Sequence, residues 1–163
     1  MVQTYIIKVA RTGEDGEKVH LLLEAGVRFH STAYARDKNL MPSSFSMKLR
    51  KHIKGKRITD IAQLGIDRVV AFTFGAAEAT HHLLLELYAA GNIILADGDF
   101  RALALLRAHM DAGAATAVAP GQLYPVSTLR LYTPVDRAGL AAALSAAADA
   151  MPLKRAPSPP FSP

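Results

Sequence analysis

The 163-residue sequence contains no cysteine. A disulfide, a thiolate zinc site and a cysteine nucleophile are therefore excluded, and the composition fits a reducing compartment. No apolar run approaches the roughly 20 residues that a membrane-spanning helix needs, and residues 1–4 lack the charged and apolar regions of a signal peptide. We therefore expect a soluble protein of the cytoplasm, with the nucleus as an alternative.

The sequence motifs of several common enzyme classes are also missing. There is no Gly-x-x-x-x-Gly-Lys-Ser/Thr phosphate loop, no Gly-x-Gly-x-x-Gly dinucleotide motif and no Gly-x-Ser-x-Gly hydrolase motif. The six histidines show no metal-ligand spacing such as His-Glu-x-x-His. We therefore expect a protein that is not an enzyme and that holds neither a metal nor a cofactor.

The net positive charge of the chain is concentrated in residues 48–68. This segment contains seven of the 19 Lys and Arg residues and two of the 14 Asp and Glu residues, which leaves twelve of each sign in the rest of the chain. The whole formal charge of +5 therefore lies in one segment. A concentrated patch attracts phosphates and releases their counterions, so RNA or DNA is the expected partner, and a merely solvated helix face is the alternative.

A short amphipathic helix is predicted to begin just before this segment and to run into it. Pro42 with Ser43 and Ser44 is typical of a helix start, Phe45, Leu49 and Ile53 recur every four residues, and Gly55 ends the pattern. An apolar stripe that packs on a sheet would leave the cations on the sides that face solvent. The candidate RNA-binding residues are Lys48, Arg50, Lys51, Lys54, Lys56 and Arg57.

Most of the remaining pattern predicts antiparallel strands. Strand-like runs cover residues 4–9, 19–24, 27–32, 58–64, 68–74, 83–88, 92–96 and 102–106, and the last of these could also be helical. Turn residues join them, with Asp97-Gly98-Asp99 the strongest hairpin signal. In the run 27–32, Val27, Phe29 and Ser31 would face a core. We expect an α+β fold: an antiparallel sandwich or meander with one short basic helix packed on it.

Three regions are expected along the chain. Residues 1–115 would form the β-rich domain, and residues 116–150 a linker followed by an alanine-rich helix that starts at Thr133-Pro134. The prolines of residues 151–163 predict a disordered tail.

Four segments together resemble one known family. They are residues 21–32 (LLLEAGVRFHST), 42–52 (PSSFSMKLRKH), 63–68 (QLGIDR) and 86–97 (ELYAAGNIILAD). They are similar, in the same order, to the NFACT N-terminal domain of the NEMF family, and to its eukaryotic branch more than to its bacterial one. The family also begins with a further helical segment and continues into helical and coiled-coil regions, so we expect the chain to be truncated at both ends.

The resemblance implies a function and a fold. It implies a ribosome-associated quality control factor that binds the large ribosomal subunit and tRNA, supports C-terminal alanine and threonine tailing, and recruits a listerin-type ubiquitin ligase. The implied fold is similar to the N-terminal domain of formamidopyrimidine DNA glycosylases, whose chemistry needs an N-terminal proline that Met1-Val2 does not supply.

The resemblance also assigns a role to one pair of residues. The residues alone suggest an ordinary turn carboxylate and a surface arginine at Asp67 and Arg68, because neighbours on a strand point to opposite faces. In the family, an Asp-Arg pair at this position supports tailing, which implies that Asp67 and Arg68 position tRNA. The competing hypothesis is a scaffold that packs on regions absent from this sequence without touching RNA.

Overall fold

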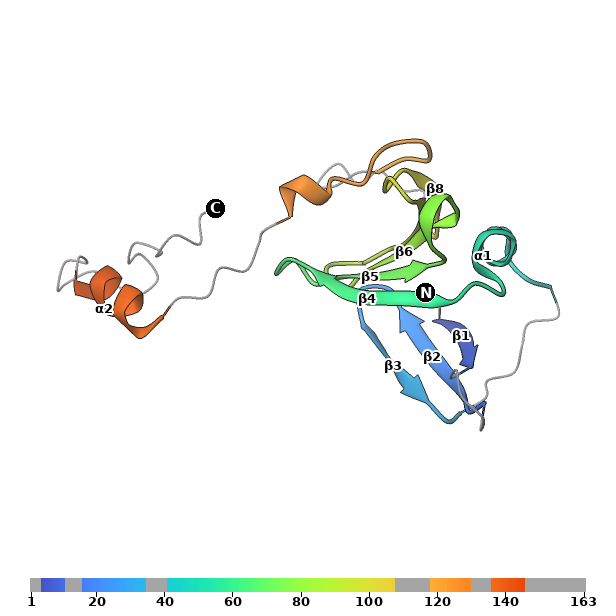
Figure 1. The fold of residues 1–163 in the computed structure, drawn as a ribbon, viewed down its shortest axis with the longest axis horizontal. Coiled ribbons are helices and arrows are strands. Elements are labelled where there is room, and N and C mark those ends of the chain that lie inside the picture. Colours follow the sequence, from blue (N-terminus) through green and yellow to red (C-terminus); the bar gives the residue numbers. More distant parts are fainter. Residues whose placement is uncertain (1–3, 11–15, 35–40, 108–117, 130–135, 146–163) are drawn as a thin grey trace.

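Two antiparallel sheets and one helix make up the body of the protein in the computed structural model (Figure 1). The structure describes residues 4–10, 16–34, 41–107, 118–129 and 136–145. The three-stranded sheet has the order β1 (Thr4–Ala10), β2 (Lys18–Glu24), β3 (Arg28–Thr32). The five-stranded sheet is a meander of β4 (Ile58–Leu64), β5 (Val69–Phe74), β6 (His81–Glu86), β7 (Ile93–Asp97) and β8 (Ala102–Leu105). The predicted α+β fold is confirmed.

The predicted basic helix is α1 (Ser44–Ile53), and its apolar stripe is buried as the spacing requires. Ser43 is the N-cap, and its hydroxyl accepts a hydrogen bond from the Ser46 amide over 3.2 Å. Pro42 therefore lies one residue before the cap and not in the first helical turn. Phe45 stacks edge-on against Tyr5 of β1, with ring centroids 5.5 Å apart, so the helix also contacts the smaller sheet.

Strand β3 departs from the predicted pattern. Its residues were expected to alternate between core and solvent, but the strand is at the edge of its sheet and all of its residues except Thr32 are exposed. Val27 lies in the β2–β3 turn and is 55% exposed, so its assignment to the core was wrong. Phe29 retains a partial core contact, because its ring packs edge-on against Phe72 at 5.7 Å.

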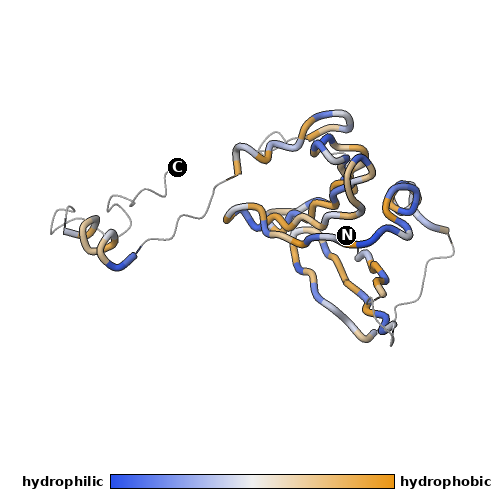
Figure 2. The backbone as a smooth tube through the Cα atoms, in the orientation of Figure 1, coloured by the Kyte–Doolittle hydropathy of each residue, from blue (hydrophilic) through white to orange (hydrophobic). Residues whose placement is uncertain are grey.

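Both faces of the five-stranded sheet are covered, which explains the almost continuous apolar runs of its central strands. One face packs on α1 and the smaller sheet through a cluster that includes Leu23, Leu49, Phe72 and Leu83. The opposite face packs on residues 118–129, from which Tyr124 is 3% exposed. The hydropathy colouring shows apolar stretches along the strands of the body (Figure 2). The domain boundary at residue 115 stays a prediction, but the chain just beyond it contributes Tyr124 to the core.

The second helix, α2 (Arg137–Ser145), lies within the predicted alanine-rich region. The Asp136 carboxylate accepts a hydrogen bond from the Gly139 amide over 2.7 Å, so Asp136 caps the helix. The predicted cap Thr133 and the predicted tail 151–163 lie outside the described residues. Among the helices that the structure describes, none is long and apolar enough to cross a membrane.

A close backbone contact joins the β2–β3 turn of the smaller sheet to the β6–β7 loop of the larger one. The Gly26 amide donates to the Glu86 carbonyl over 2.8 Å. A Cβ atom on Gly91 would lie 1.9 Å from the Gly26 nitrogen, and Gly91 also has a φ of +63°. Only glycine fits both requirements at residue 91.

We expect Gly91→Ala to reduce the free energy of unfolding by more than about 3 kcal/mol, because the new methyl group forces the two segments apart. Gly55→Ala is the matched control, since Gly55 has a φ of +77° and no atom within 4 Å of its Cβ position. This control should cost only about 1 kcal/mol from backbone strain. Urea unfolding of both variants measures the difference, and equal losses would show that the contact is not a packing constraint.

Candidate nucleic-acid interface

The apolar stripe of α1 directs its cations to solvent. Phe45, Leu49 and Ile53 are at most 9% exposed. Five of the six predicted RNA-binding residues are exposed: Lys48, Arg50, Lys51, Lys54 and Arg57. Figure 2 shows α1 and the chain leading from it into β4 as the hydrophilic edge of the body.

Acids in the described part of the chain do not pair with these cations. Within the described part of the chain, the ion pair that forms is Arg28 with Glu24, at 2.8 Å, and none of the six predicted RNA-binding residues has an acidic partner. An exposed cluster of unpaired cations produces a local positive potential that draws polyanions. The sequence-based expectation of an outward-facing basic face is therefore met for five residues.

Lys56 is different, because it is partly buried and engaged. Its ammonium contacts the Ala79 carbonyl and lies 3.0 Å from Nδ1 of His81. His81 in turn lies 3.0 Å from His52 of α1. Sequence reasoning missed this cluster, because 25 residues separate Lys56 from His81.

Asp67 and Arg68 lie in the turn that joins β4 to β5, and β5 begins only at Val69. The prediction that a strand starts at Arg68 was therefore one residue too early, and the opposite-face argument does not apply to the pair. Arg68 is exposed and has a φ of 55°, a left-handed conformation that is strained for a side chain with a Cβ. Such strain is concentrated at functional sites, where the surrounding structure holds it in place.

The structure does not bring the two halves of the predicted site together. Lys56 and Arg57 precede β4, and Asp67 and Arg68 follow it. Because a strand rises about 3.3 Å per residue, the seven residues of β4 separate the two groups by about 20 Å. A single ligand that touches both must be an extended one.

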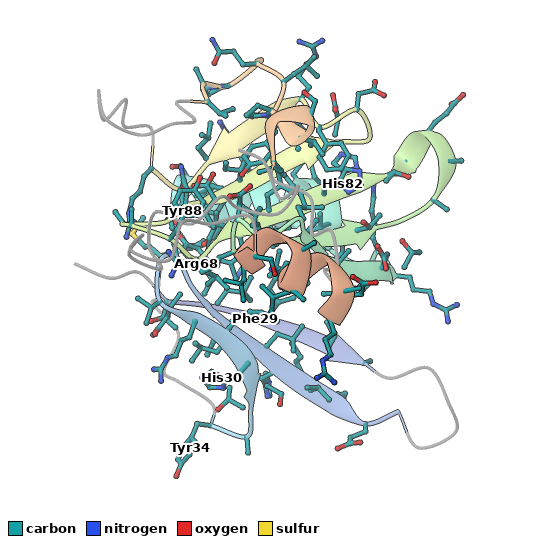
Figure 3. All side chains as sticks on the ribbon, turned by 90° about the vertical axis from the view of Figure 1, so that its left-hand side faces the viewer. Phe29, His30, Tyr34, Arg68, His82 and Tyr88 are labelled. Carbon is teal, nitrogen blue, oxygen red and sulfur yellow. The ribbon has the colours of Figure 1, made fainter. Side chains whose placement is uncertain are left out.

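The Asp67–Arg68 turn rests on the β6–β7 loop. The Arg68 carbonyl accepts a hydrogen bond from the Leu87 amide over 2.9 Å. Figure 3 shows Arg68 on the same side of the molecule as Tyr88, the loop residue that follows Leu87. The loop itself contains a second left-handed residue, Ala89, with a φ of 47°. The turn is therefore held by backbone contacts from a neighbouring strand connection.

A buried carboxylate lies beneath this loop. Glu86 is 7% exposed, and its Oε1 accepts hydrogen bonds from the hydroxyls of Tyr88 at 3.1 Å and Tyr124 at 3.0 Å. Burial raises the pKa of Glu86, and the two hydroxyls only partly oppose that shift. Burial likewise raises the pKa of Tyr124. Glu86 was not singled out from the sequence, although it is a charged residue that interrupts an apolar run.

The described residues contain no group of three or more His, Asp or Glu side chains arranged to hold a metal ion. An open pocket between Ala77–Thr80 and the β7–β8 turn is lined by Glu78, His81, Asp97 and Asp99. The Asp97 carboxylate accepts hydrogen bonds from the amides of Asp99 and Arg101, which fixes the predicted hairpin turn.

Comparison with known proteins gives consistent matches. The family model for NFACT N-terminal and middle domains matches residues 3–128. The Drosophila melanogaster ribosome quality control complex subunit NEMF homolog is 47% identical over 131 residues, which is 80% of this chain and 13% of that protein. Human ribosome quality control complex subunit NEMF is 42% identical over 133 residues, 82% of this chain and 12% of that protein. The chain thus spans about an eighth of the length of these relatives.

Solved structures support the fold. The N-terminal domain of the fibronectin-binding protein PavA from Streptococcus pneumoniae superimposes with a TM-score of 0.67 at 22% identity, covering 90% of this chain and 62% of that one.

The buried carboxylate predicts a pH-dependent stability. The pKa of Glu86 is raised in the folded state. Its contribution to the stability of the fold is therefore fully present at a pH below its unfolded pKa, near 4.5, and is lost as the pH rises through its folded pKa. Glu86→Gln keeps an acceptor for both hydroxyls and cannot ionise. Relative to wild type, the variant should therefore gain stability as pH rises from 4 towards 7 in urea unfolding. Glu78→Gln, at an exposed position, is the control and should show no such trend. A stability difference between wild type and Glu86→Gln that does not change with pH would mean that folding does not raise the pKa of the Glu86 carboxylate.

Proposed function

This chain belongs to the family of NFACT N-terminal and middle domains, and from that premise we propose that it is the RNA-binding module of a ribosome-associated quality control factor. Its role would be to bind rather than to catalyse, in the cytoplasm. The relatives are named as subunits of the ribosome quality control complex. Large-subunit rRNA and tRNA are the proposed partners of this piece. Alanine and threonine tailing and recruitment of a listerin-type ligase would belong to the whole protein to which it contributes.

The observation that carries the proposal is the display of cations by α1 and by the chain that leads from it into β4. Five of them are exposed and without an acidic partner among the described residues. Each phosphate that such a cation neutralises releases condensed counterions, which favours binding. These contacts hold an RNA in register but do not read its sequence.

The separation of the two ends of β4 fits a nucleic acid better than a small ligand. An RNA lying along this edge would contact the α1 cations at one end and the Asp67–Arg68 turn about 20 Å away. The guanidinium of Arg68 can bind a phosphate in a bidentate manner, and a carboxylate at Asp67 can accept hydrogen bonds from base or ribose groups. The pair would therefore position one part of a tRNA that the basic face attracts.

A scaffold role is the second candidate. Met47, Ile61 and Ile66 are 54%, 50% and 45% exposed, and regions present in the longer relatives could cover them. Mixing this chain with the remainder of a full-length family member, with and without ribonuclease treatment, separates the two roles. Association that survives ribonuclease favours the scaffold, and association that is lost favours RNA binding.

The basic face predicts a salt-dependent affinity for tRNA. Replacing Lys48, Lys51 and Lys54 by alanine should reduce the slope of log affinity against log salt by about 2 to 3, because each contact contributes roughly 0.7 to 0.9. The control replaces Lys8, Lys18 and Arg137, which removes the same charge from exposed positions outside α1. Fluorescence anisotropy with labelled tRNA measures both. Equal slopes for the two triple variants would reject a specific role for α1.

The Asp67–Arg68 turn predicts a separable effect on tailing. In a full-length family member, Asp67→Ala with Arg68→Ala should abolish alanine and threonine tailing and leave large-subunit binding intact. Arg68→Gly distinguishes charge from strain, because glycine relieves the left-handed backbone while removing the guanidinium. We expect this variant to be at least as stable as wild type and still defective in tailing. Loss of subunit binding together with tailing would indicate misfolding instead.

A further inference from the structure

Three basic side chains from three segments meet where α1 ends. His52 Nδ1 of α1 lies 3.0 Å from His81 Nε2, and His81 Nδ1 lies 3.0 Å from Lys56 Nζ. The two imidazole rings have centroids 5.0 Å apart and are tilted by 42°. Lys56 is thereby turned inward, unlike the other five candidate cations.

Nδ1 of His81 lies 3.0 Å from both Lys56 Nζ and the Ala79 carbonyl, and of these two contacts the one with Lys56 requires both imidazoles to be neutral. An ammonium has hydrogen-bond donors and no acceptor, so Nδ1 of His81 must accept from Lys56. The proton of His81 is then on Nε2 and is donated to Nδ1 of His52, which must also accept. The pKa of His52 is lowered by burial and by the neighbouring His81, Lys51 and Lys56, in agreement with a neutral ring.

The structure also provides the contact that would replace this one. The Ala79 carbonyl, which Lys56 contacts, lies 3.0 Å from Nδ1 of His81. A protonated His81 can donate to that carbonyl from Nδ1, and it then repels the ammonium and no longer offers it an acceptor. Protonation of His81 therefore removes the hydrogen bond from Lys56 to Nδ1, and the protonated ring competes with Lys56 for the Ala79 carbonyl.

Some of the charged groups around His81 oppose a positive charge on its ring and others favour it. Lys56 and the imidazoles of His52 and His82 oppose a further positive charge on His81. Asp97, which pairs with His81 across β6 and β7, favours it, as do Glu78 and Asp99 in the adjoining pocket. His81 thus lies between a basic helix and an acidic pocket.

We propose, on the premise that the chain binds RNA, that His52 and His81 form a proton switch which holds Lys56 inward when neutral and releases it to the basic face when protonated. The released ammonium and the new imidazolium add two cations for backbone phosphates. RNA binding and proton uptake are therefore linked, and each favours the other.

The switch is tested first without RNA. Acetylation of Lys56 relative to Lys54, measured by mass spectrometry on the full 163-residue chain, reports how accessible the Lys56 amine is. The Lys56-to-Lys54 ratio should rise by about threefold to tenfold between about pH 8 and about pH 5.5, because one to two hydrogen bonds are lost. In the His52→Gln, His81→Gln double variant the ratio should not change with pH. His30→Gln, at an exposed position on β3, is the matched control and should respond as wild type does.

The link to RNA is tested with unfractionated tRNA in anisotropy titrations at the same two pH values. Wild-type affinity should rise by about tenfold on acidification, and the salt slope should steepen by about 1 to 2. Both changes should disappear in the double variant and persist in His30→Gln. A double variant that keeps the wild-type pH dependence overturns the link.

The two arms separate the switch from the function on which it depends. A Lys56-to-Lys54 ratio that stays constant on acidification overturns the switch, whatever the RNA result. If the ratio rises but tRNA binds at neither pH value, the proposed RNA-binding function fails and the coupling fails with it, although Lys56 release is confirmed.

Discussion

The burial of three apolar side chains on α1 determines where the net charge of this chain points. Phe45, Leu49 and Ile53 recur every four residues, so the helix buries them together in one rotational setting. The cations between them then lie outside, because desolvating an unpaired ammonium or guanidinium costs several kcal/mol. Cations that are clustered in the sequence are thereby placed together on the surface of the protein. The hydrophobic contact and the electrostatic face are two consequences of one spacing.

The groups at the two ends of β4 differ in how they could contact a ligand. The α1 end offers several exposed cations, which attract a polyanion from a distance and hold it through interchangeable contacts. The Asp67–Arg68 end offers one donor and one acceptor on a left-handed turn that is fixed by the β6–β7 loop. Attraction at one end and fixed geometry at the other suit a ligand that must be captured first and then placed.

Sequence patterns predicted the elements but not all of the contacts between them. The α1 stripe, the β2–β3 hairpin and the β4–β8 meander follow from periodicity and turn residues, which act locally. Val27 was misassigned because β3 begins one residue later than the pattern suggests, at Arg28, and Val27 belongs to the preceding turn. The left-handed backbone at Arg68 could not be foreseen, since nothing in an arginine favours it. The Lys56–His81 contact depends on the register of β6 and on the position of α1, and no local rule provides either. Glu86 did leave a signal, as a charge within an apolar run.

Polar groups at the two ends of β6 fix loops more than they stabilise the fold. An apolar residue in place of Glu86 would complete the apolar run of β6 and avoid the desolvation of a carboxylate. That replacement would also leave the hydroxyls of Tyr88 and Tyr124 without their common acceptor and free the loop on which Arg68 rests. At the other end of the strand, the imidazole of His81, the first residue of β6, contacts Lys56 and His52 of α1. In each case a polar group ties together segments distant in sequence, and those segments carry the residues that face the proposed ligand.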